Sequence, residues 1–271
     1  MNIVVCVKYV PDSTADRHFE DDNTVDRVGV DGLLSELDEY AIEQALQLKE
    51  KLADSAPDTV VTALTVGPED ATTAIRKALQ MGADRGVHVT DETIAGSDSL
   101  ATSLVLAEAI KKVGADSGWD LVVCGMASTD GSMGVVPAML AERLDVPALT
   151  LGSEVELADD GGTALRIRRD GDSATETIEG DLPLVLSVTD QSGEARYPSF
   201  KGIMAAKKKP LDTWSLSDLG VDAELVGLSA SYSAVESTEA RPPRSQGEVV
   251  ADEDGSGAKA LVEFLASKKF I

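Results

Sequence analysis

The sequence predicts an α/β fold in which a doubly wound, mainly parallel, Rossmann-like sheet is followed by a C-terminal arm and helix. Apolar runs of strand length alternate with amphipathic stretches of helix length over the first two-thirds of the chain. Such regular alternation is typical of parallel sheets with right-handed crossovers. After Leu149 the alternation gives way to short strands and turns, which indicates an addition to the sheet.

The expected strands are continuous apolar runs, because a strand of a parallel sheet is buried on both faces. In the first half of the chain these runs are 3–10 (IVVCVKYV), 59–66 (TVVTALTV), 85–90 (RGVHVT) and 120–125 (DLVVCG). The stretches between them predict helices over 35–52, 68–81 and 97–113. At the start of the first helix, Ser35 and Asp38 have the spacing of a capping box.

The part of the chain after Leu149 predicts hairpins, one further strand, an arm and a terminal helix. Asp-Asp-Gly-Gly at 159–162 and Asp-Gly at 170–171 favour turns between antiparallel strands. The last apolar strand is expected at 183–189, and no further strand of that quality is expected after it. The segment 229–257, rich in Ser, Glu, Pro and Gly, indicates an extended arm. The final stretch, 257–270, predicts a short helix with one apolar face that packs on another protein.

Acidic residues outnumber basic ones by 48 to 24, which gives the 271-residue chain a formal net charge of -24. This charge argues against nucleic acid or an anionic membrane surface as a partner, because both would be repelled. Acid spread so evenly, with few lysines, favours an origin in a high-salt cytoplasm, where screening weakens charge repulsion. An ordinary acidic protein is the alternative.

Membrane, metal and thiol chemistry find little support in the sequence. No apolar run is long enough for a transmembrane helix, and the N-terminal run is interrupted by Lys8, so a cytoplasmic protein without direct membrane insertion is expected. Cys6 and Cys124 lie in apolar runs, where a thiol is typically a buried hydrophobe. His18 and His88 have no cluster of ligands beside them, so no metal site is expected.

The loop after the run 120–125 is the first place to expect a ligand, because open parallel sheets bind ligands beyond the carboxyl ends of their strands. Its sequence, GMASTDGSMG, supplies three glycines and three hydroxyl side chains, and a helix is expected to start near Met133 with Pro137 in its first turn. Glycine backbone and a helix N-terminus together favour a phosphate. The spacing matches neither the dinucleotide fingerprint nor a P-loop, and a purely structural turn is the alternative.

Several stretches carry a resemblance that runs nearly from end to end. They are VCVKYVPD (5–12), DEYAIEQALQLKE (38–50), ALTVGPEDATTAIRKALQMGADRGVHV (63–89), LVVCGMASTDGSMG (121–134) and RYPSFKGIMAAKKKP (196–210). The chain resembles the beta subunit of electron transfer flavoprotein. The signature stretch of that family also fits 167–187, except that Ser173 and Ala174 stand where the family usually has acid or glycine.

The resemblance implies a sheet of the adenine-nucleotide-binding type and two cofactors. In that family the beta subunit pairs with a larger alpha subunit that holds most of the redox-active FAD. The beta subunit itself binds a second nucleotide, which is AMP in most members and FAD in the electron-bifurcating ones. Carried over by position, the residues implied at this second site are Cys6, Ser35, Glu36, Leu37, Asp38, Val66, Gly125, Met126, Ala127, Ser128, Thr129, Asp130, Gly131, Ser132, Met133, Gly134, Val135 and Val136.

Two departures from the family pattern leave the choice between AMP and FAD open. The family commonly reads Asn-Pro-Phe-Asp-Glu-Tyr at the helix start, where this chain has Ser-Glu-Leu-Asp-Glu-Tyr (35–40). It commonly reads Gly-Lys-Gln at the loop start, where this chain has Gly-Met-Ala (125–127). Asp38 and Asp130 are retained.

Residues 191–210, here called the docking segment, combine apolar side chains with lysines. The resemblance implies that 191–205 is a recognition loop for partner dehydrogenases, with Phe200 in the place of an anchoring leucine. The implied docking residues are Tyr197, Phe200, Ile203 and Met204. Lys201 and Lys207 to Lys209 would steer the approach of the partner, while the apolar anchor supplies affinity. A solvated face is the alternative for the lysines.

The function implied is that of an electron carrier subunit with no catalytic residues of its own. It would accept electrons from flavoprotein dehydrogenases, such as acyl-CoA dehydrogenases, and pass them through the FAD to a membrane ETF-quinone oxidoreductase. Two alternatives stay open: a bifurcating carrier with FAD in the second site, and a stand-alone adenine-nucleotide-binding regulator of the stress-protein type. The expected organisation is a nucleotide-binding α/β domain (1–190), the docking segment with its lysine run (191–210), and an arm and terminal helix packing on the alpha subunit (211–271).

Overall fold

The computed structural model describes residues 1–158, 161–240, 242, 247, 249–252 and 255–271. It divides the chain into two units, Met1–Glu236 and Ser237–Ile271, which are described separately.

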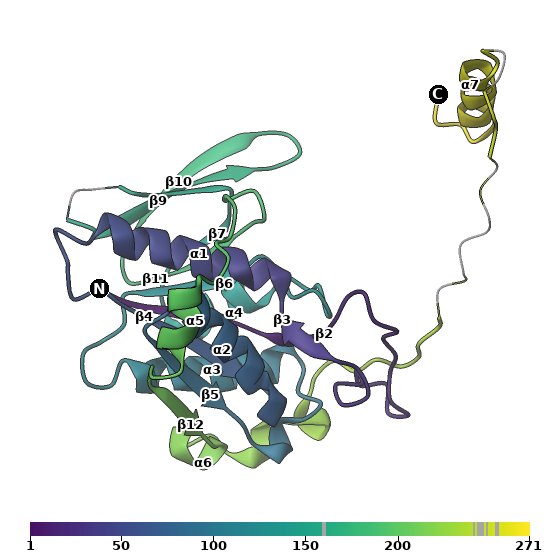
Figure 1. The fold of residues 1–271 in the computed structure, drawn as a ribbon. Helices are drawn as coiled ribbons and strands as arrows, with labels where there is room; N and C mark the ends of the chain where they lie inside the picture. Colours follow the sequence, from purple (N-terminus) through teal and green to yellow (C-terminus); the bar gives the residue numbers. More distant parts are fainter. Residues whose placement is uncertain (159–160, 241, 243–246, 248, 253–254) are drawn as a thin grey trace. The chain divides into compact units, whose positions relative to one another are not determined.

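A seven-stranded sheet forms the centre of the first unit (Figure 1). Its strand order is β12-β5-β4-β1-β6-β11-β7, and every pair of neighbours is parallel. The strands are β1 (Asn2–Cys6), β4 (Val60–Val66), β5 (Arg85–Val89), β6 (Leu121–Gly125), β7 (Ala148–Gly152), β11 (Leu184–Val188) and β12 (Leu211–Trp214). This arrangement confirms the predicted α/β fold class.

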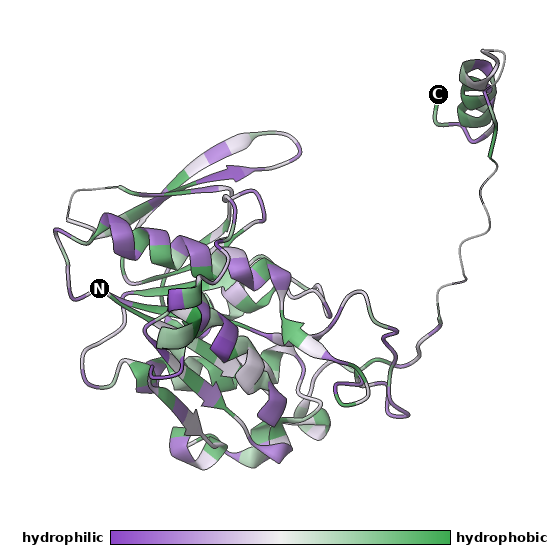
Figure 2. Ribbon diagram, viewed as in Figure 1, coloured by the Kyte–Doolittle hydropathy of each residue, from purple (hydrophilic) through white to green (hydrophobic). Residues whose placement is uncertain are grey.

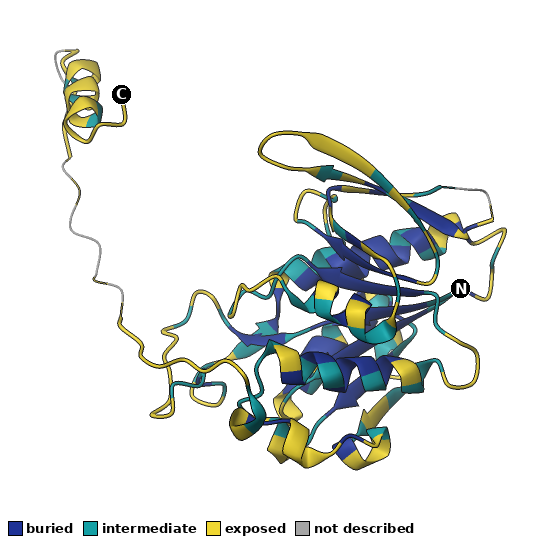
Figure 3. Ribbon diagram, turned by 180° about the vertical axis from the view of Figure 1, so that it is seen from behind, coloured by how far each residue is buried: buried dark blue, intermediate teal, exposed yellow. Residues whose placement is uncertain are grey.

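Helices cover both faces of this sheet, so its central strands are buried on two sides. The long helices are α1 (Glu36–Lys51), α2 (Thr72–Met81), α3 (Ser99–Val113) and α4 (Val136–Leu144). Ile3 and Val5 of β1 belong to the core under α1 and α2, whereas Val4 belongs to the core under α3 and α4. Figure 3 shows the central strands dark blue because both of their faces are covered. A fully buried Ile or Val side chain contributes roughly 1.5–3 kcal/mol to stability, which explains the continuous apolar runs.

Two smaller sheets lie beside the main one. The expected hairpin region forms an antiparallel sheet of β8 (Glu154–Leu157), β9 (Ala164–Asp170) and β10 (Thr175–Asp181). The predicted turn at 159–162 falls partly on Asp159 and Asp160, which lie outside the described residues. A second antiparallel pair joins β2 (Tyr9–Pro11) to β3 (Gly32–Leu34).

The predicted first strand, 3–10, was wrong in its extent. β1 ends at Cys6, and the chain enters β2 in another sheet at Tyr9. The reason lies at Lys8, whose backbone N–H donates to Oδ2 of Asp38 (2.8 Å) instead of continuing the ladder of β1. Apolar residues lie on both sides of Lys8 because both strands are buried, although they belong to different sheets.

The sequence predicted no further strand of comparable apolar quality after Thr189, and the one described strand that follows, β12, was not predicted. β12 pairs with β5 at one edge of the main sheet. Its sequence, Leu-Asp-Thr-Trp, is short and half exposed, since an edge strand has one free side and needs no continuous apolar run. The short helices α5 (Phe200–Ala206) and α6 (Leu216–Leu219) flank this strand. Elsewhere in the unit, 3₁₀ turns lie at Glu69–Ala71, Glu92–Ile94, Ala223–Leu225 and Leu228–Ala230.

The expected arm, 229–257, begins later than predicted. The carboxylate of Asp98 caps α3 and also accepts hydrogen bonds from the backbone N–H groups of Tyr232 (2.9 Å) and Ser233 (3.0 Å). Residues up to Ser233 therefore pack on the first unit. Positions 241, 243–246, 248 and 253–254 of the predicted arm lie outside the described residues.

The second unit contains the predicted terminal helix, α7 (Gly257–Ser267). Figure 2 shows hydrophobic residues, in green, along this helix, and its exposed apolar side chains include Leu261, Val262 and Phe264. None of the residues of α7 is buried. No helix in the described part of the chain is long and apolar enough to cross a membrane.

Candidate functional site at the carboxyl edge of the sheet

The carboxyl ends of three neighbouring strands meet at one edge of the main sheet. β4, β1 and β6 lie side by side and end at Val66, Cys6 and Gly125. Helix α1 begins at the same edge, directly after Ser35. The structure therefore brings together the strand ends, the start of α1 and the loop of residues 126–135, here called the β6–α4 loop.

Asp38 lies at the centre of this edge and is buried. One oxygen of its carboxylate accepts the backbone N–H of Lys8, and the backbone of Gly125 also hydrogen-bonds to it. Burial raises the pKa of Asp38 to about 7, although these hydrogen bonds and the charge of Lys8 act in the opposite direction. A Cβ at Gly125 would lie 2.6 Å from Oδ1 of Asp38, so only glycine allows α1 to approach β6 this closely.

The predicted capping box at the start of α1 was wrong. No side chain caps this helix, and the backbone N–H of Asp38 donates to the carbonyl of Ser35 (2.9 Å). The hydroxyl of Ser35 instead accepts the backbone N–H of Thr129 (3.3 Å). The hydroxyl of Ser35 and the carboxylate of Asp38 therefore connect the start of α1 to neighbouring segments of the site.

Asp130 holds the β6–α4 loop to the N-terminal part of the chain. Its Oδ1 lies 2.8 Å from Nζ of Lys8, and its Oδ2 lies 2.7 Å from Nη2 of Arg27. The carboxylate is only 4% exposed. Burial alone would raise the pKa of Asp130, but the two cations outweigh burial and hold it well below its ordinary value. Arg17 adds a hydrogen bond to the carbonyl of Thr129 (3.2 Å).

Three basic residues thus surround this loop in a strongly acidic chain. Sequence reasoning missed Lys8, Arg17 and Arg27 as site residues. No local signal in the sequence indicated them, because the first 27 residues hold three basic and six acidic residues, the same two-to-one ratio as the whole chain. Their cationic groups make the edge of the sheet locally less repulsive to an anion.

The end of the β6–α4 loop presents backbone donors. Ser132 and Gly134 have positive φ angles of 52° and 66°, and they turn the chain into α4. The helix begins at Val136 with Pro137 in its first turn, rather than near Met133 as predicted. No group in the described part of the chain accepts a hydrogen bond from the backbone N–H of Gly134 or Val135. An anion placed before α4 would find these donors and the positive end of the helix dipole.

The two cysteines are adjacent on β1 and β6. Cys124 is buried, and its hydrogen bond to Cys6, together with burial, raises the pKa of its thiol. A thiol of this kind stays protonated and behaves as a small hydrophobe. Among the described residues, no group of three or more His, Cys, Asp or Glu side chains could hold a metal ion.

The docking segment places its predicted apolar residues on the surface. Tyr197 is 90% exposed and Phe200 is 80% exposed, and Met204 and Ile203 are also exposed. Phe200, Ile203 and Met204 belong to α5. An exposed cluster of large apolar side chains is unusual on a protein that functions alone.

The predicted lysine run is divided between two roles. Lys207 and Lys208 are exposed. Lys209 is half-buried, and its Nζ donates to the carbonyls of Leu79 (2.9 Å) and Ala83 (2.6 Å) at the C-terminal end of α2. Lys209 is therefore a structural contact rather than part of a solvated patch.

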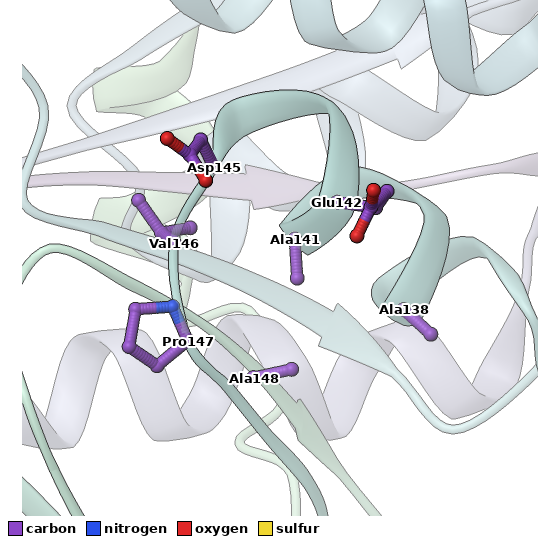
Figure 4. Close-up of a pocket in the computed structure, with 7 residues that line it drawn as sticks. All are labelled: Ala138, Ala141, Glu142, Asp145, Val146, Pro147 and Ala148. Atoms are coloured by element: carbon purple, nitrogen blue, oxygen red, sulfur yellow. The ribbon is translucent and has the colours of Figure 1, made fainter.

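A shallow pocket lies at the C-terminal end of α4 (Figure 4). Its lining consists of Ala138, Ala141, Glu142, Asp145, Val146, Pro147 and Ala148. None of the residues predicted for the nucleotide or for docking belongs to it, and the β6–α4 loop lies at the opposite end of the helix.

The fold and this loop place the chain among doubly wound α/β proteins, which bind ligands at the carboxyl edge of the sheet. Residues 22–219 match the electron transfer flavoprotein domain. Over 271 residues the chain is 44% identical to the electron transfer flavoprotein subunit beta of Mycobacterium tuberculosis, covering 100% of this chain and 99% of the relative. The chain therefore belongs to the electron transfer flavoprotein family, among its beta subunits.

More distant relatives carry other names. The chain is 33% identical over 271 residues to Protein FixA of Azotobacter vinelandii, with 100% and 95% of the two chains covered. It is 34% identical over 268 residues to the caffeyl-CoA reductase-Etf complex subunit CarD of Acetobacterium woodii, with 99% and 97% covered. Beta subunits of this family are electron carrier subunits rather than enzymes, they pair with an alpha subunit, and the family binds flavin and AMP. The predicted family and the carrier role are confirmed.

Proposed function

We propose that this chain is the beta subunit of a heterodimeric electron transfer flavoprotein that accepts electrons from flavoprotein dehydrogenases, such as acyl-CoA dehydrogenases. The electrons pass through an FAD held mainly by the alpha subunit to a membrane quinone oxidoreductase. The observation that carries the proposal is the 44% identity over the full chain to proteins named electron transfer flavoprotein subunit beta. The redox chemistry belongs to the flavin, so this chain supplies a scaffold, a nucleotide site and a docking surface.

The second nucleotide in this proposal is AMP, bound at the carboxyl edge of the sheet. Its phosphate would lie before α4, where the backbone N–H groups of Gly134 and Val135 have no acceptor among the described residues. Lys8 and Arg27 would lower the electrostatic cost of bringing the anion there. The close packing of Asp38 on Gly125 fixes the floor of the site.

A bifurcating carrier is the second candidate. It is favoured by the relatives named Protein FixA and caffeyl-CoA reductase-Etf complex subunit CarD. In such a carrier the second site would hold FAD instead of AMP, so the nucleotides released from the purified heterodimer distinguish the two.

Two surfaces of the chain are proposed as interfaces. Phe200, with Tyr197, Ile203 and Met204, would dock on the dehydrogenase, since large exposed apolar side chains supply most of the energy of an interface. The exposed apolar residues of α7 would pack on the alpha subunit. The charge of -24 further leads us to propose that the protein works at high salt concentration.

Co-expression with the alpha subunit tests the proposed partnership. The chain expressed alone should bind little flavin and should bind a hydrophobic dye through its exposed apolar residues. Co-expression should give a yellow heterodimer that survives gel filtration. A flavin-loaded monomer that gains nothing from the alpha subunit would contradict the proposal.

A further inference from the structure

The docking segment is joined to α1 by one arginine that contacts two carboxylates. Nε and Nη2 of Arg196 donate to the two oxygens of Glu43 (2.6 Å and 3.0 Å). Nη1 and Nη2 donate to the two oxygens of Glu50 (2.6 Å and 3.2 Å). The backbone N–H of Arg196 also donates to Glu43 (3.1 Å). We call these three side chains the Arg196 cluster.

The geometry of this cluster is specific to arginine. Glu43 and Glu50 are seven residues apart, so they lie on the same face of α1, two turns from each other. A planar guanidinium can contact both carboxylates with two hydrogen bonds each, whereas a lysine ammonium is a point charge. The Glu43 side chain is only 6% exposed. A buried carboxylate left without its partner would be costly, so the cluster is strongly held together.

Other contacts attach the two ends of the docking segment to α1 and α2. The side-chain amide of Gln44, also on α1, donates to the carbonyl of Ser192 (2.7 Å). At the other end, Lys209 binds the C-terminal carbonyls of α2. Between them, a Cβ at Gly202 would lie 2.5 Å from the carbonyl of Gln80, so α5 packs directly on α2.

The exposed anchor residues lie between these attachments. Tyr197 directly follows Arg196 in the chain, and Phe200 begins α5 three residues later. Both side chains are almost fully exposed, so they contribute little to holding the segment themselves. Their positions therefore depend on the attachments at either side, of which the Arg196 cluster is the nearest to Tyr197 and the contact of Gly202 with Gln80 is the nearest to Phe200.

We propose that Arg196 is a positioning residue that holds the docking segment in one conformation, so that Phe200 is already in its binding position before the partner dehydrogenase arrives. The inference rests on the proposed function, since it takes the segment as the docking surface. A segment ordered before binding loses less conformational entropy when the complex forms, and binding is correspondingly tighter. Loss of the cluster should therefore weaken docking without altering the flavin.

The test compares Arg196→Met with Arg196→Lys in the purified heterodimer, with Arg166→Met as the matched control. Arg166 pairs with the exposed carboxylate of Glu179 on the β9–β10 hairpin, away from the docking segment in the sequence. Two quantities are measured: hydrogen exchange of the backbone amides of 192–206, and KM and kcat for electron transfer from a reduced acyl-CoA dehydrogenase. Thermal unfolding and flavin content verify that each variant is folded.

In Arg196→Met we expect exchange over 192–206 to accelerate at least tenfold and KM for the dehydrogenase to rise about tenfold, with kcat unchanged. Arg196→Lys should fall between this variant and the wild type, and Arg166→Met should match the wild type. Unchanged exchange in Arg196→Met would overturn the inference. An unchanged KM would overturn it too, provided that Phe200→Ala raises KM in the same assay. If Phe200→Ala leaves KM unchanged, the proposed docking role fails instead, and the exchange rates alone decide whether Arg196 holds the segment.

Discussion

Nζ of Lys8 lies 2.8 Å from Oδ1 of Asp130, and this ion pair joins the end of β1 to the loop that follows β6. The backbone N–H of the same lysine donates to Asp38 at the start of α1. One residue thus connects three of the segments that form the candidate nucleotide site. The site is consequently a network in which a change to one member should be felt by the others.

Asp130→Asn should weaken binding of the second nucleotide and leave the flavin content unchanged. The substitution removes the charge that pairs with Lys8 and Arg27. Both cations are partly exposed, so the expected loss is on the order of 1–2 kcal/mol, which corresponds to about tenfold in nucleotide affinity. Denaturing the wild-type heterodimer should release about one FAD and one AMP, and the variant should release FAD with little AMP. Glu179→Gln, which breaks an exposed pair with Arg166, is the control. Full retention of AMP in Asp130→Asn would show that the loop does not depend on this ion pair.

Asp38 should make stability fall as the pH rises from 5 to 7.5. Its pKa of about 7 in the folded protein exceeds its ordinary value of 3.8, so the folded chain keeps a proton that the unfolded chain releases. The stabilisation is complete below the ordinary value and is lost as the pH rises through 7. Relative to Asp38→Asn, which cannot titrate, the wild type should lose on the order of 2 kcal/mol over this range. Urea unfolding at several pH values measures the difference, and a difference that stays constant would mean that Asp38 is ionised throughout.

The central strands of the sheet were predictable because they are buried on both faces. Runs such as 121–125 have no polar interruption, and the pattern of one long helix between strands leaves few topologies open. β12 was not predictable in the same way, because an edge strand with Asp212 exposed carries no apolar run. The break between β1 and β2 depends on a hydrogen bond from Lys8 to Asp38, a contact between residues thirty positions apart. Such contacts leave no periodic signal.

High salt should stabilise this protein. With a formal net charge of -24, repulsion among exposed carboxylates opposes the compact state. Raising KCl from 0.1 M to 1 M shortens the screening length from about 10 Å to about 3 Å. The midpoint of thermal unfolding should rise by about 3 °C or more, since a change on the order of 1 kcal/mol shifts a domain of this size by about that much. A midpoint that falls with KCl would indicate that the ion pairs outweigh the repulsion.

Phe200→Ala should separate docking from assembly. Removing this exposed ring should cost on the order of 2 kcal/mol of docking energy, as typical interface hot spots do. Electron transfer from the dehydrogenase should then fall at least tenfold at limiting concentrations. Flavin content, heterodimer assembly and reduction by dithionite should stay normal.

Substitutions of the lysines that follow Phe200 should affect electron transfer less than Phe200→Ala does. Lys207→Gln with Lys208→Gln should have a smaller effect than Phe200→Ala, and less still in 1 M KCl, because both side chains are exposed. Lys209→Gln should lower thermal stability instead, because its ammonium binds the C-terminal carbonyls of α2. A wild-type transfer rate in Phe200→Ala would mean that the docking role does not extend to this chain.

The location of the candidate site was predictable from the sequence. The side-chain contacts within it were not. The switch-point rule and the glycines of GMASTDGSMG indicate the β6–α4 loop directly. The roles of Arg27 and Arg196 depend on which carboxylates they meet after folding, at distances of 103 and 153 residues along the chain. Similarly, Ser35 has the spacing of a cap, but tertiary packing directs its hydroxyl to Thr129. Local sequence predicted neither outcome, because both were decided by long-range contacts.

Reduction of the heterodimer's flavin by a reduced acyl-CoA dehydrogenase is the most direct test of the carrier role. In a stopped-flow experiment at physiological salt and at 1 M KCl, the absorbance of the oxidised flavin should bleach within a few turnovers, at a rate that saturates with dehydrogenase concentration. The reduced heterodimer should then be reoxidised by a quinone oxidoreductase. A heterodimer whose flavin is reduced by dithionite, but not by any flavoprotein dehydrogenase supplied, would contradict the account.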